Sequence, residues 1–223
     1  MNINYLLIAA ASYLIGSIPF ALLYIKLLLN KDIRSFGSKN TGALNALRIA
    51  SHEKGRAWGV ISFLIVFFFD AFKGAIAVIL ATNLMPENTI LSITIATFFA
   101  ILGHNYSIIL NFKGGRGAAT LGGILLYLNW QVFLGSVITI LCFMILAEAL
   151  AGRRISKKFF KKAVSDQIIG RLIGEAYAVW WIYLFDQTLF YPALFGTMLV
   201  IFSHKDRLTD QIKEIKNKAY LNG

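Results

Sequence analysis

Long apolar segments dominate the sequence, and they restrict its fold more than any other feature. Hydrophobic residues make up 57% of the 223 positions and charged residues only 15%, whereas soluble domains have about 45–50% and about 25%. About 20 apolar residues in a helix cross the hydrocarbon core of a bilayer. Backbone groups in that core need partners within their own segment, which favours helices. The pattern predicts an all-α polytopic membrane protein.

Seven of these segments are predicted to span the membrane. Pro19 lies in the middle of the first and removes a backbone hydrogen bond, so we expect a kink there. The fourth is short, and we expect it to tilt or to be shielded by its neighbours. Residues 1–223 are predicted to form one transmembrane helical domain with a polar tail at 203–223. The predicted spans are 3–29, 57–85, 90–110, 118–129, 132–150, 168–185 and 189–202.

The basic residues lie almost entirely in alternate connections between these spans. An excess of Lys and Arg marks cytoplasmic loops, which predicts an N-terminus outside and a C-terminus in the cytoplasm. Topology and anionic lipid headgroups also explain the net charge of +11 without a nucleic-acid partner. The only cysteine, Cys142, lies in an apolar segment, so no disulfide framework, metal site or cofactor is expected. The basic connections are 30–56, 112–117, 153–162 and the tail.

A glycine-rich loop between the third and fourth spans is a candidate phosphate site. Three glycines in four residues allow a tight turn whose N–H groups point inward, and such a nest binds anions. Basic side chains add charge, and the N-terminus of the following helix also favours an anion. An ordinary turn with cytoplasmic Lys and Arg explains the same spacing. The residues concerned are Lys113, Gly114, Gly115, Arg116, Gly117 and Thr120.

The first polar connection, 30–56, is predicted to be a loop on the same side of the membrane. Ser38, Asn40 and Asn45 offer hydrogen bonds to a polyol, and Arg48 can form a forked contact with a phosphate. Asx and Ser turns in a solvated loop account for part of this composition. They do not account for a second glycine-containing loop on the same face.

Ionisable residues also occur within the apolar segments. Asp70 and Lys73 are three residues apart and are expected to pair. Such residues are costly at membrane depth and often functional, although a structural pair is the alternative. His104 is expected to be an interfacial hydrogen-bonding residue, with a catalytic base as the weaker hypothesis. Glu148 and Glu175, near span ends, are expected to be interfacial.

Taken in order, these segments resemble the PlsY family, the bacterial acyl-phosphate:glycerol-3-phosphate acyltransferases. The resemblance is strong over residues 13–125 and fades afterwards. It implies a seven-helix enzyme of the bacterial inner membrane with its active face in the cytoplasm. The implied reaction moves a fatty acyl group from acyl phosphate to the sn-1 hydroxyl of glycerol-3-phosphate, giving lysophosphatidic acid and phosphate for phospholipid synthesis. The matching segments are 16–20, 32–34, 37–48, 70–74, 103–107 and 112–120.

The resemblance also assigns roles within the site. The glycine-rich loop would hold the donor phosphate, with Arg116 stabilising charge during attack by the glycerol hydroxyl. A phosphate oxygen of the donor would accept the proton, and His104 is a weaker candidate base. The acceptor, glycerol-3-phosphate, would be bound by Ser38, Asn40, Asn45, Arg48, Ser165, His204 and Arg207.

Several residues depart from the family pattern, mostly on the acceptor side. Arg116 stands where Lys is usual, Lys39 where Gly is common, and Arg207 in an Asn position. Ser165 fits the first of two serines, whereas Ile168 replaces the second. Two alternatives therefore stay open: a non-catalytic or altered-acceptor paralogue that binds acyl phosphate or lysophospholipid, and a transporter of a phosphorylated solute. The sequence indicates no oligomeric state.

Overall fold

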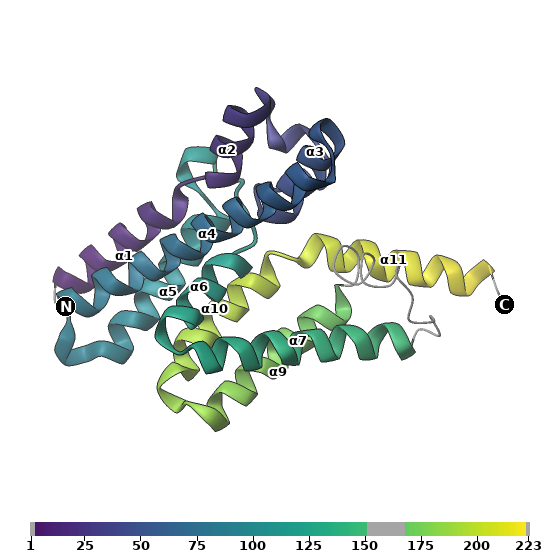
Figure 1. The fold of residues 1–223 in the computed structure, drawn as a ribbon. Coiled ribbons are helices and arrows are strands. Elements are labelled where there is room, and N and C mark those ends of the chain that lie inside the picture. Colours follow the sequence, from purple (N-terminus) through teal and green to yellow (C-terminus); the bar gives the residue numbers. More distant parts are fainter. Residues whose placement is uncertain (1–2, 151–167, 222–223) are drawn as a thin grey trace.

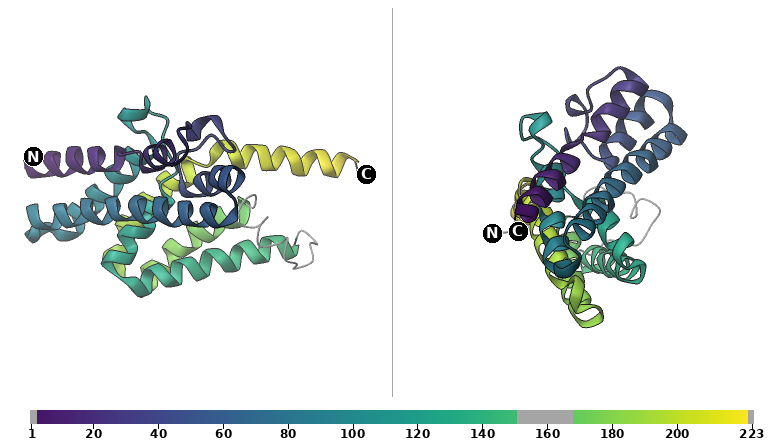
Figure 2. Two further views of the ribbon diagram at one scale, coloured as in Figure 1. Left: turned by 45° about the horizontal axis from the view of Figure 1, so that its top comes forward. Right: turned by 90° about the vertical axis from the view of Figure 1, so that its left-hand side faces the viewer.

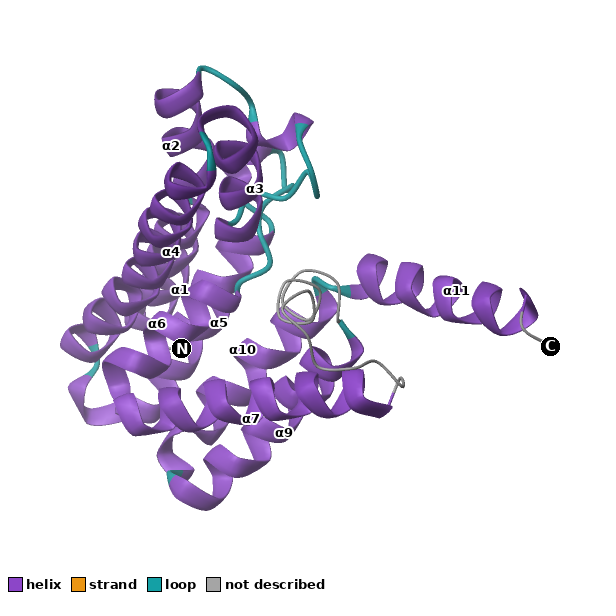
Figure 3. Cartoon of the chain, turned by 45° about the vertical axis from the view of Figure 1, so that its right-hand side comes forward, coloured by secondary structure: helices purple, strands orange, loops and turns teal. Residues whose placement is uncertain are grey.

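The computed structural model describes residues 3–150 and 168–221, and every regular element in these ranges is helical (Figure 3). This confirms the predicted all-α class. The predicted basic connection 153–162 and Ser165 lie outside the described residues. The α-helices are α1 (Ile3–Ser17), α2 (Phe20–Leu29), α3 (Ala43–Lys54), α4 (Arg56–Leu84), α5 (Thr89–Asn105), α6 (Ala118–Leu128), α7 (Trp130–Leu150), α9 (Ile169–Phe185), α10 (Phe190–Phe202) and α11 (Lys205–Leu221).

Four stretches among the described residues are long and apolar enough to cross a membrane, namely Ile3–Leu29, Arg56–Leu84, Pro86–Leu110 and Trp130–Leu150. The helices α6 and α10 are shorter apolar helices, and α9 has 17 residues. The short α6 packs against α4, α5, α7 and α10, as expected for a span shielded by its neighbours.

The first span is broken at the predicted proline. The helix α1 ends at Ser17 and α2 begins at Phe20, which leaves Ile18 and Pro19 between them. The Lys73 ammonium donates to the Ile18 carbonyl oxygen at 3.0 Å and pairs with an Asp70 carboxylate oxygen at 2.9 Å. Both ionic side chains are almost fully buried. The predicted pair therefore exists, and it also satisfies a carbonyl group freed by the break.

The helices of the first half approach one another closely where glycines face them. A Cβ atom on Gly16 would overlap the Ala100 backbone in the contact between α1 and α5. A Cβ atom on Gly123 would overlap the Ala71 backbone in the contact between α4 and α6. Small residues at such positions allow close helix packing within membranes. Figure 1 shows α1 beside α4 and α5, while α7 and α9 form a second packed pair.

The polar connection 30–56 contains a helix, which corrects the prediction of a loop. In α3, Ala46, Ile49 and Ala50 recur at helical spacing and are buried. Ala46 and Ile49 belong to a packed group with Val66 of α4 and apolar residues of α2. Polar residues are concentrated in the last turn of α3, 51–54, and in the segment 30–42 before the helix. The polar composition of the whole connection therefore conceals a helix with a buried apolar face.

The predicted polar tail forms α11, which extends beyond the bundle at the end away from the N-terminus (Figure 2). The side-chain oxygen of Gln211 accepts hydrogen bonds from the backbone N–H groups of Ile168 and Ile169, at 2.9 and 3.2 Å. These N–H groups lie at the start of α9 and lack partners within that helix. Gln211 therefore caps α9 and fixes α11 against it.

The buried ion pair gives a test of this fold. Lys73→Met removes the partner of Asp70 and the donor to Ile18, and we expect it to destabilise the protein by about 3–5 kcal/mol. The double variant Asp70→Asn/Lys73→Met leaves no buried charge and should be more stable than Lys73→Met alone. Thermal unfolding of the purified protein in detergent measures both effects. Strictly additive effects of the two substitutions would contradict the pairing.

Candidate functional site

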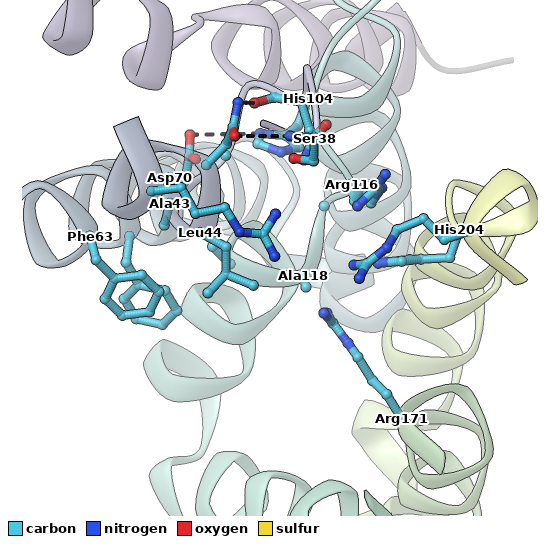
Figure 4. A pocket seen from close by; sticks show the side chains of 18 residues that line it. Ser38, Ala43, Leu44, Phe63, Asp70, His104, Arg116, Ala118, Arg171 and His204 are labelled. Carbon is cyan, nitrogen blue, oxygen red and sulfur yellow. Dashed lines mark hydrogen bonds and ion pairs between the residues drawn. The ribbon is translucent and has the colours of Figure 1, made fainter. Parts of the chain in front are cut away.

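A cavity of about 260 Å³ lies between α3, α4, the glycine-rich loop, α9 and the junction of α10 with α11 (Figure 4). One wall is apolar and includes Leu44, Phe63 and Phe67. The two phenylalanine rings are stacked, with centroids 5.9 Å apart. The opposite wall is polar. The cavity is therefore amphipathic, as a site for a ligand with a charged head and an apolar chain requires.

Four arginines from four separate segments line the polar wall. Arg48 comes from α3, Arg116 from the glycine-rich loop, Arg171 from α9 and Arg207 from α11. Among the described lining residues Asp70 is the acidic one, and it is paired with Lys73. The cavity thus has a surplus of positive charge, which favours anionic ligands.

The electrostatics of Arg116 reflect this crowding. Burial, followed by the nearby positive charges of Arg207, Arg171 and Arg48, lowers the pKa of its guanidinium to about 10. A shift in this direction means that the charged form is disfavoured in the cavity without a ligand. A bound anion would relieve both the repulsion and the loss of hydration.

His204 lines the same cavity from the end of α10. Its Nδ1 lies 2.8 Å from the Val200 carbonyl oxygen, which can only accept, so Nδ1 carries the proton. Burial, followed by the charge of Arg171, lowers the His204 pKa to about 3. At neutral pH the ring is therefore uncharged, and Nε2 is its hydrogen-bond acceptor. Next to it, the Ser203 hydroxyl donates to the Arg116 carbonyl oxygen at 3.2 Å.

The glycine-rich loop differs from the predicted nest of amides. The Gly114 N–H donates to the Asn105 carbonyl at 3.0 Å, and the Gly115 N–H donates to the His104 carbonyl at 2.8 Å. A Cβ atom on Gly114 would overlap the His104 carbonyl, and one on Gly115 would overlap the His104 ring. The expectation that these two amides face a ligand is therefore wrong. The glycines are needed for close packing against the end of α5.

The N-terminus of α6 is the part of this region that faces the cavity. Gly117 has a φ of 79° and turns the chain into α6. Ala118 and Ala119 line the cavity, and N–H groups in the first turn of a helix have no partner within it. The helix start therefore offers the donors that the sequence suggested for the glycines.

The remaining predicted donor-side residues are spread over different surroundings. Lys113, Gly114 and Gly115 line a second cavity of about 240 Å³, which shares Asn40 and Arg116 with the first. Thr120 is fully buried and lines neither of these cavities. The structure therefore brings Arg116 and Gly117 to the larger cavity and separates the others from it.

His104 and Asp70 meet at the base of the larger cavity. His104 Nδ1 lies 3.6 Å from an Asp70 carboxylate oxygen, and both side chains are buried. Gly115 packs against the Nε2 side of the ring. His104 thus joins the glycine-rich loop to the ion pair of α4.

The first polar segment is organised by Asn45. Its side-chain amide donates to the carbonyl oxygens of Ile33, Phe36 and Asn40 at 2.9–3.0 Å, and its oxygen accepts from the Ser38 N–H at 3.2 Å. Asn45 lines the cavity, but the polar atoms of its side chain form hydrogen bonds within the loop. Ser38, Asn40 and Arg48 also line the cavity. Asn45 therefore holds the loop that presents its neighbours.

The same loop contains Lys39 with a φ of 57°. This left-handed conformation favours glycine, because a Cβ atom is strained there. The departure from glycine noted in the sequence thus falls on a backbone position where glycine is the residue that fits best.

Sequence reasoning did not assign a site role to Arg171, Phe63 or Phe67. The available signal was that Arg171 and Glu175 lie one helical turn apart within an apolar segment, the same kind of pattern as Asp70 and Lys73. Glu175 is buried and bonded to Arg171, and the interfacial position predicted for it stays a prediction. Glu148 is also buried.

Asn45 provides a test of how the loop is held. Asn45→Ala removes all of its loop contacts, and we expect a loss of stability of about 2–3 kcal/mol, because several buried groups lose their partners. Asn40→Ala is the matched control and should change stability by less than about 0.5 kcal/mol. Thermal unfolding in detergent compares the two. Equal midpoints for Asn45→Ala and the parent protein would contradict the organising role.

Comparison with known proteins identifies a family for this chain. The family model described as glycerol-3-phosphate acyltransferase matches residues 6–214. The glycerol-3-phosphate acyltransferase of Pelagibacter ubique is 32% identical over 215 residues, covering 96% of this chain and 95% of that protein. The one from Anaplasma marginale (strain Florida) is 31% identical over 222 residues, covering 99% and 98%.

The fold also matches a solved structure. The crystal structure of PlsY, an integral membrane glycerol 3-phosphate acyltransferase, in its glycerol 3-phosphate form gives a TM-score of 0.69 at 24% identity and covers 94% of this chain and 92% of that chain. Its lysophosphatidic acid form gives a TM-score of 0.67. With the family model matching almost the whole chain, this protein belongs to the glycerol-3-phosphate acyltransferase family.

Proposed function

We propose that this enzyme transfers a fatty acyl group from acyl phosphate to the sn-1 hydroxyl of glycerol-3-phosphate and releases lysophosphatidic acid and phosphate. One observation carries the proposal: four arginines meet an apolar wall in a single cavity. A phosphate monoester carries about two negative charges near neutral pH. Donor and acceptor together therefore bring about four negative charges, and the four guanidiniums of the cavity favour such ligands.

The donor is assigned to the side formed by Arg116 and the start of α6. Arg116 and the first amides of α6 are suited to the donor phosphate. Phe63 and Phe67 offer an apolar surface to the first carbons of the acyl chain. Lys113, Gly114, Gly115 and Thr120, predicted from the sequence as donor contacts, are kept as residues that shape the loop.

The acceptor is assigned to the side formed by α3 and the junction of α10 with α11. Ser38, Asn40 and Arg48 would bind glycerol-3-phosphate from one side, and His204 and Arg207 from the other. Asn45 supports these contacts from within the loop. A PlsY structure in its glycerol 3-phosphate form shares this fold, which supports the choice of acceptor. Ser165 stays a prediction.

The reaction needs positioning and charge stabilisation more than a protein nucleophile. The acceptor oxygen forms a bond to the acyl carbon, and the bond from that carbon to the phosphate oxygen breaks. The hydroxyl proton passes to an oxygen of the departing phosphate. Arg116 and the α6 amides stabilise the charge that develops. Gly115 covers the Nε2 side of His104, which favours a supporting role for His104 over that of a base.

We also propose seven membrane spans, with the N-terminus outside and the site facing the bacterial cytoplasm. The helices α3 and α11 lie at the end of the bundle away from the N-terminus (Figure 2). This is the end that carries the predicted cytoplasmic connections, and the uneven placement of Lys and Arg supports its orientation.

A second candidate is an enzyme or binding protein with an altered acceptor. Arg207, which stands where the family pattern has Asn, favours this candidate. The transporter hypothesis loses its main support, because Asp70 and Lys73 pair with each other and are almost fully buried.

The proposal is tested by phosphate release from palmitoyl phosphate, with and without glycerol-3-phosphate. We expect release to depend on glycerol-3-phosphate and lysophosphatidic acid to form in equal amount. Binding of palmitoyl phosphate without glycerol-3-phosphate-dependent release would instead favour the altered-acceptor or non-catalytic candidate.

Two substitutions separate the donor and acceptor sides. Arg116→Ala should lower kcat at least about a hundredfold, because it removes a donor to the developing charge. Arg48→Ala should chiefly raise KM for glycerol-3-phosphate. Arg56, an exposed arginine at the start of α4 that lines neither cavity, supplies the control Arg56→Ala, which should leave both parameters unchanged. Near-normal kcat in Arg116→Ala would overturn the donor assignment.

A further inference from the structure

Arg171 is an unassigned cation at the edge of the cavity. In Figure 4 its side chain extends from α9 toward Ala118, on the side of the cavity where His204 lies. Its Nε donates to a Glu175 carboxylate oxygen at 2.9 Å, one helical turn away. The side chains of Arg171 and Glu175 are 19% and 8% exposed. The buried Glu175 carboxylate thus fixes the Arg171 guanidinium through its Nε.

The contact through Nε determines how the guanidinium is presented. Arginine offers five N–H donors in a rigid plane. The bond to Glu175 uses Nε, and the end of the Arg171 side chain extends toward Ala118 (Figure 4). Such a fork matches the oxygens of a phosphate.

The position of Arg171 is electrostatically unfavourable without an anion. It lies in the first turn of α9, where the helix dipole disfavours a cation. Three other arginines line the same cavity. Glu175 offsets the charge of Arg171, and an anion in the cavity would also weaken the repulsion that Arg116 experiences from Arg207, Arg171 and Arg48.

The location relative to Arg207 points to one side of the site. Gln211 of α11 caps the start of α9, which fixes the segment carrying Arg207 against the segment carrying Arg171. Arg171 also acts electrostatically on both His204 and Arg116. Arg171, His204 and Arg207 therefore line the same cavity from segments that are joined by the Gln211 cap.

We propose that Arg171 binds the phosphate of glycerol-3-phosphate and that Glu175 is the residue that positions it. The inference rests on the proposed function, since it concerns the acceptor of that reaction. It assigns to α9 a part of the site that the sequence motifs do not contain.

The test uses a variant that avoids an unpaired buried charge. Arg171→Gln/Glu175→Gln replaces the ion pair by two amides that can still hydrogen-bond. It should raise KM for glycerol-3-phosphate at least about tenfold through loss of a charge-assisted contact, while KM for palmitoyl phosphate changes less than about threefold. Arg171→Lys keeps the charge without the forked geometry, so its KM for glycerol-3-phosphate should lie between those of the parent protein and the double variant. Arg56→Gln, at an exposed position outside the cavity, is the matched control and should resemble the parent protein.

Glu175→Gln alone separates positioning from binding. It keeps an oxygen that can accept from Nε, so KM for glycerol-3-phosphate should rise only a few-fold. Glu175→Leu removes that oxygen and should raise the same KM further, with kcat less affected. A purely structural role would instead lower kcat and leave KM for glycerol-3-phosphate unchanged, which would overturn the inference.

A binding measurement distinguishes failure of this inference from failure of the proposed function. Glycerol-3-phosphate that binds the folded state should raise the thermal unfolding midpoint of the parent protein. If the parent protein shows no turnover, but glycerol-3-phosphate raises its unfolding midpoint and does not raise that of Arg171→Gln/Glu175→Gln, the proposed function is contradicted and the role of Arg171 is supported. Turnover with an unchanged KM in that variant would overturn the role of Arg171 alone. Neither protection nor turnover would overturn both.

Discussion

The ammonium of Lys73 is the point on which the first half of the structure depends. It satisfies a carbonyl oxygen at the break between α1 and α2 and pairs with Asp70 of its own helix. Asp70 in turn faces His104 of α5, and Gly115 rests on His104. One buried charge therefore connects two helices, a helix break and the glycine-rich loop. A polar network of this kind is stable only when each member has a partner.

The cavity next to this network brings like charges together, which is electrostatically unfavourable. Four guanidiniums share a partly buried space. Loss of hydration, followed by repulsion from the other three, lowers the pKa of Arg116. The surrounding helices hold them in place by capping and packing, as Gln211 does for α9. Sites that are arranged before the ligand arrives stabilise charge without reorganising during the reaction. The repulsion and desolvation of the guanidiniums lower the stability of the folded protein.

The features that the sequence predicted well are those with a local physical cause. Pro19 cannot donate a backbone hydrogen bond, and Asp70 and Lys73 must pair at their depth, so the break and the pair were predictable. The helix α3 was not predicted because the connection 30–56 is mostly polar, which conceals the apolar face of the helix. Arg171 was missed because the structure of the cavity, rather than sequence spacing, places it beside His204 and Arg207.

The glycines at positions 114 and 115 bear on how such sequences are compared. Their amides bond to the end of α5, and a side chain at either position would collide with His104. Selection for an intact loop would preserve them even in a relative that had lost its chemistry. The glycine pattern therefore indicates that the loop can form, whereas the arginines proposed to bind the substrates would indicate catalytic competence.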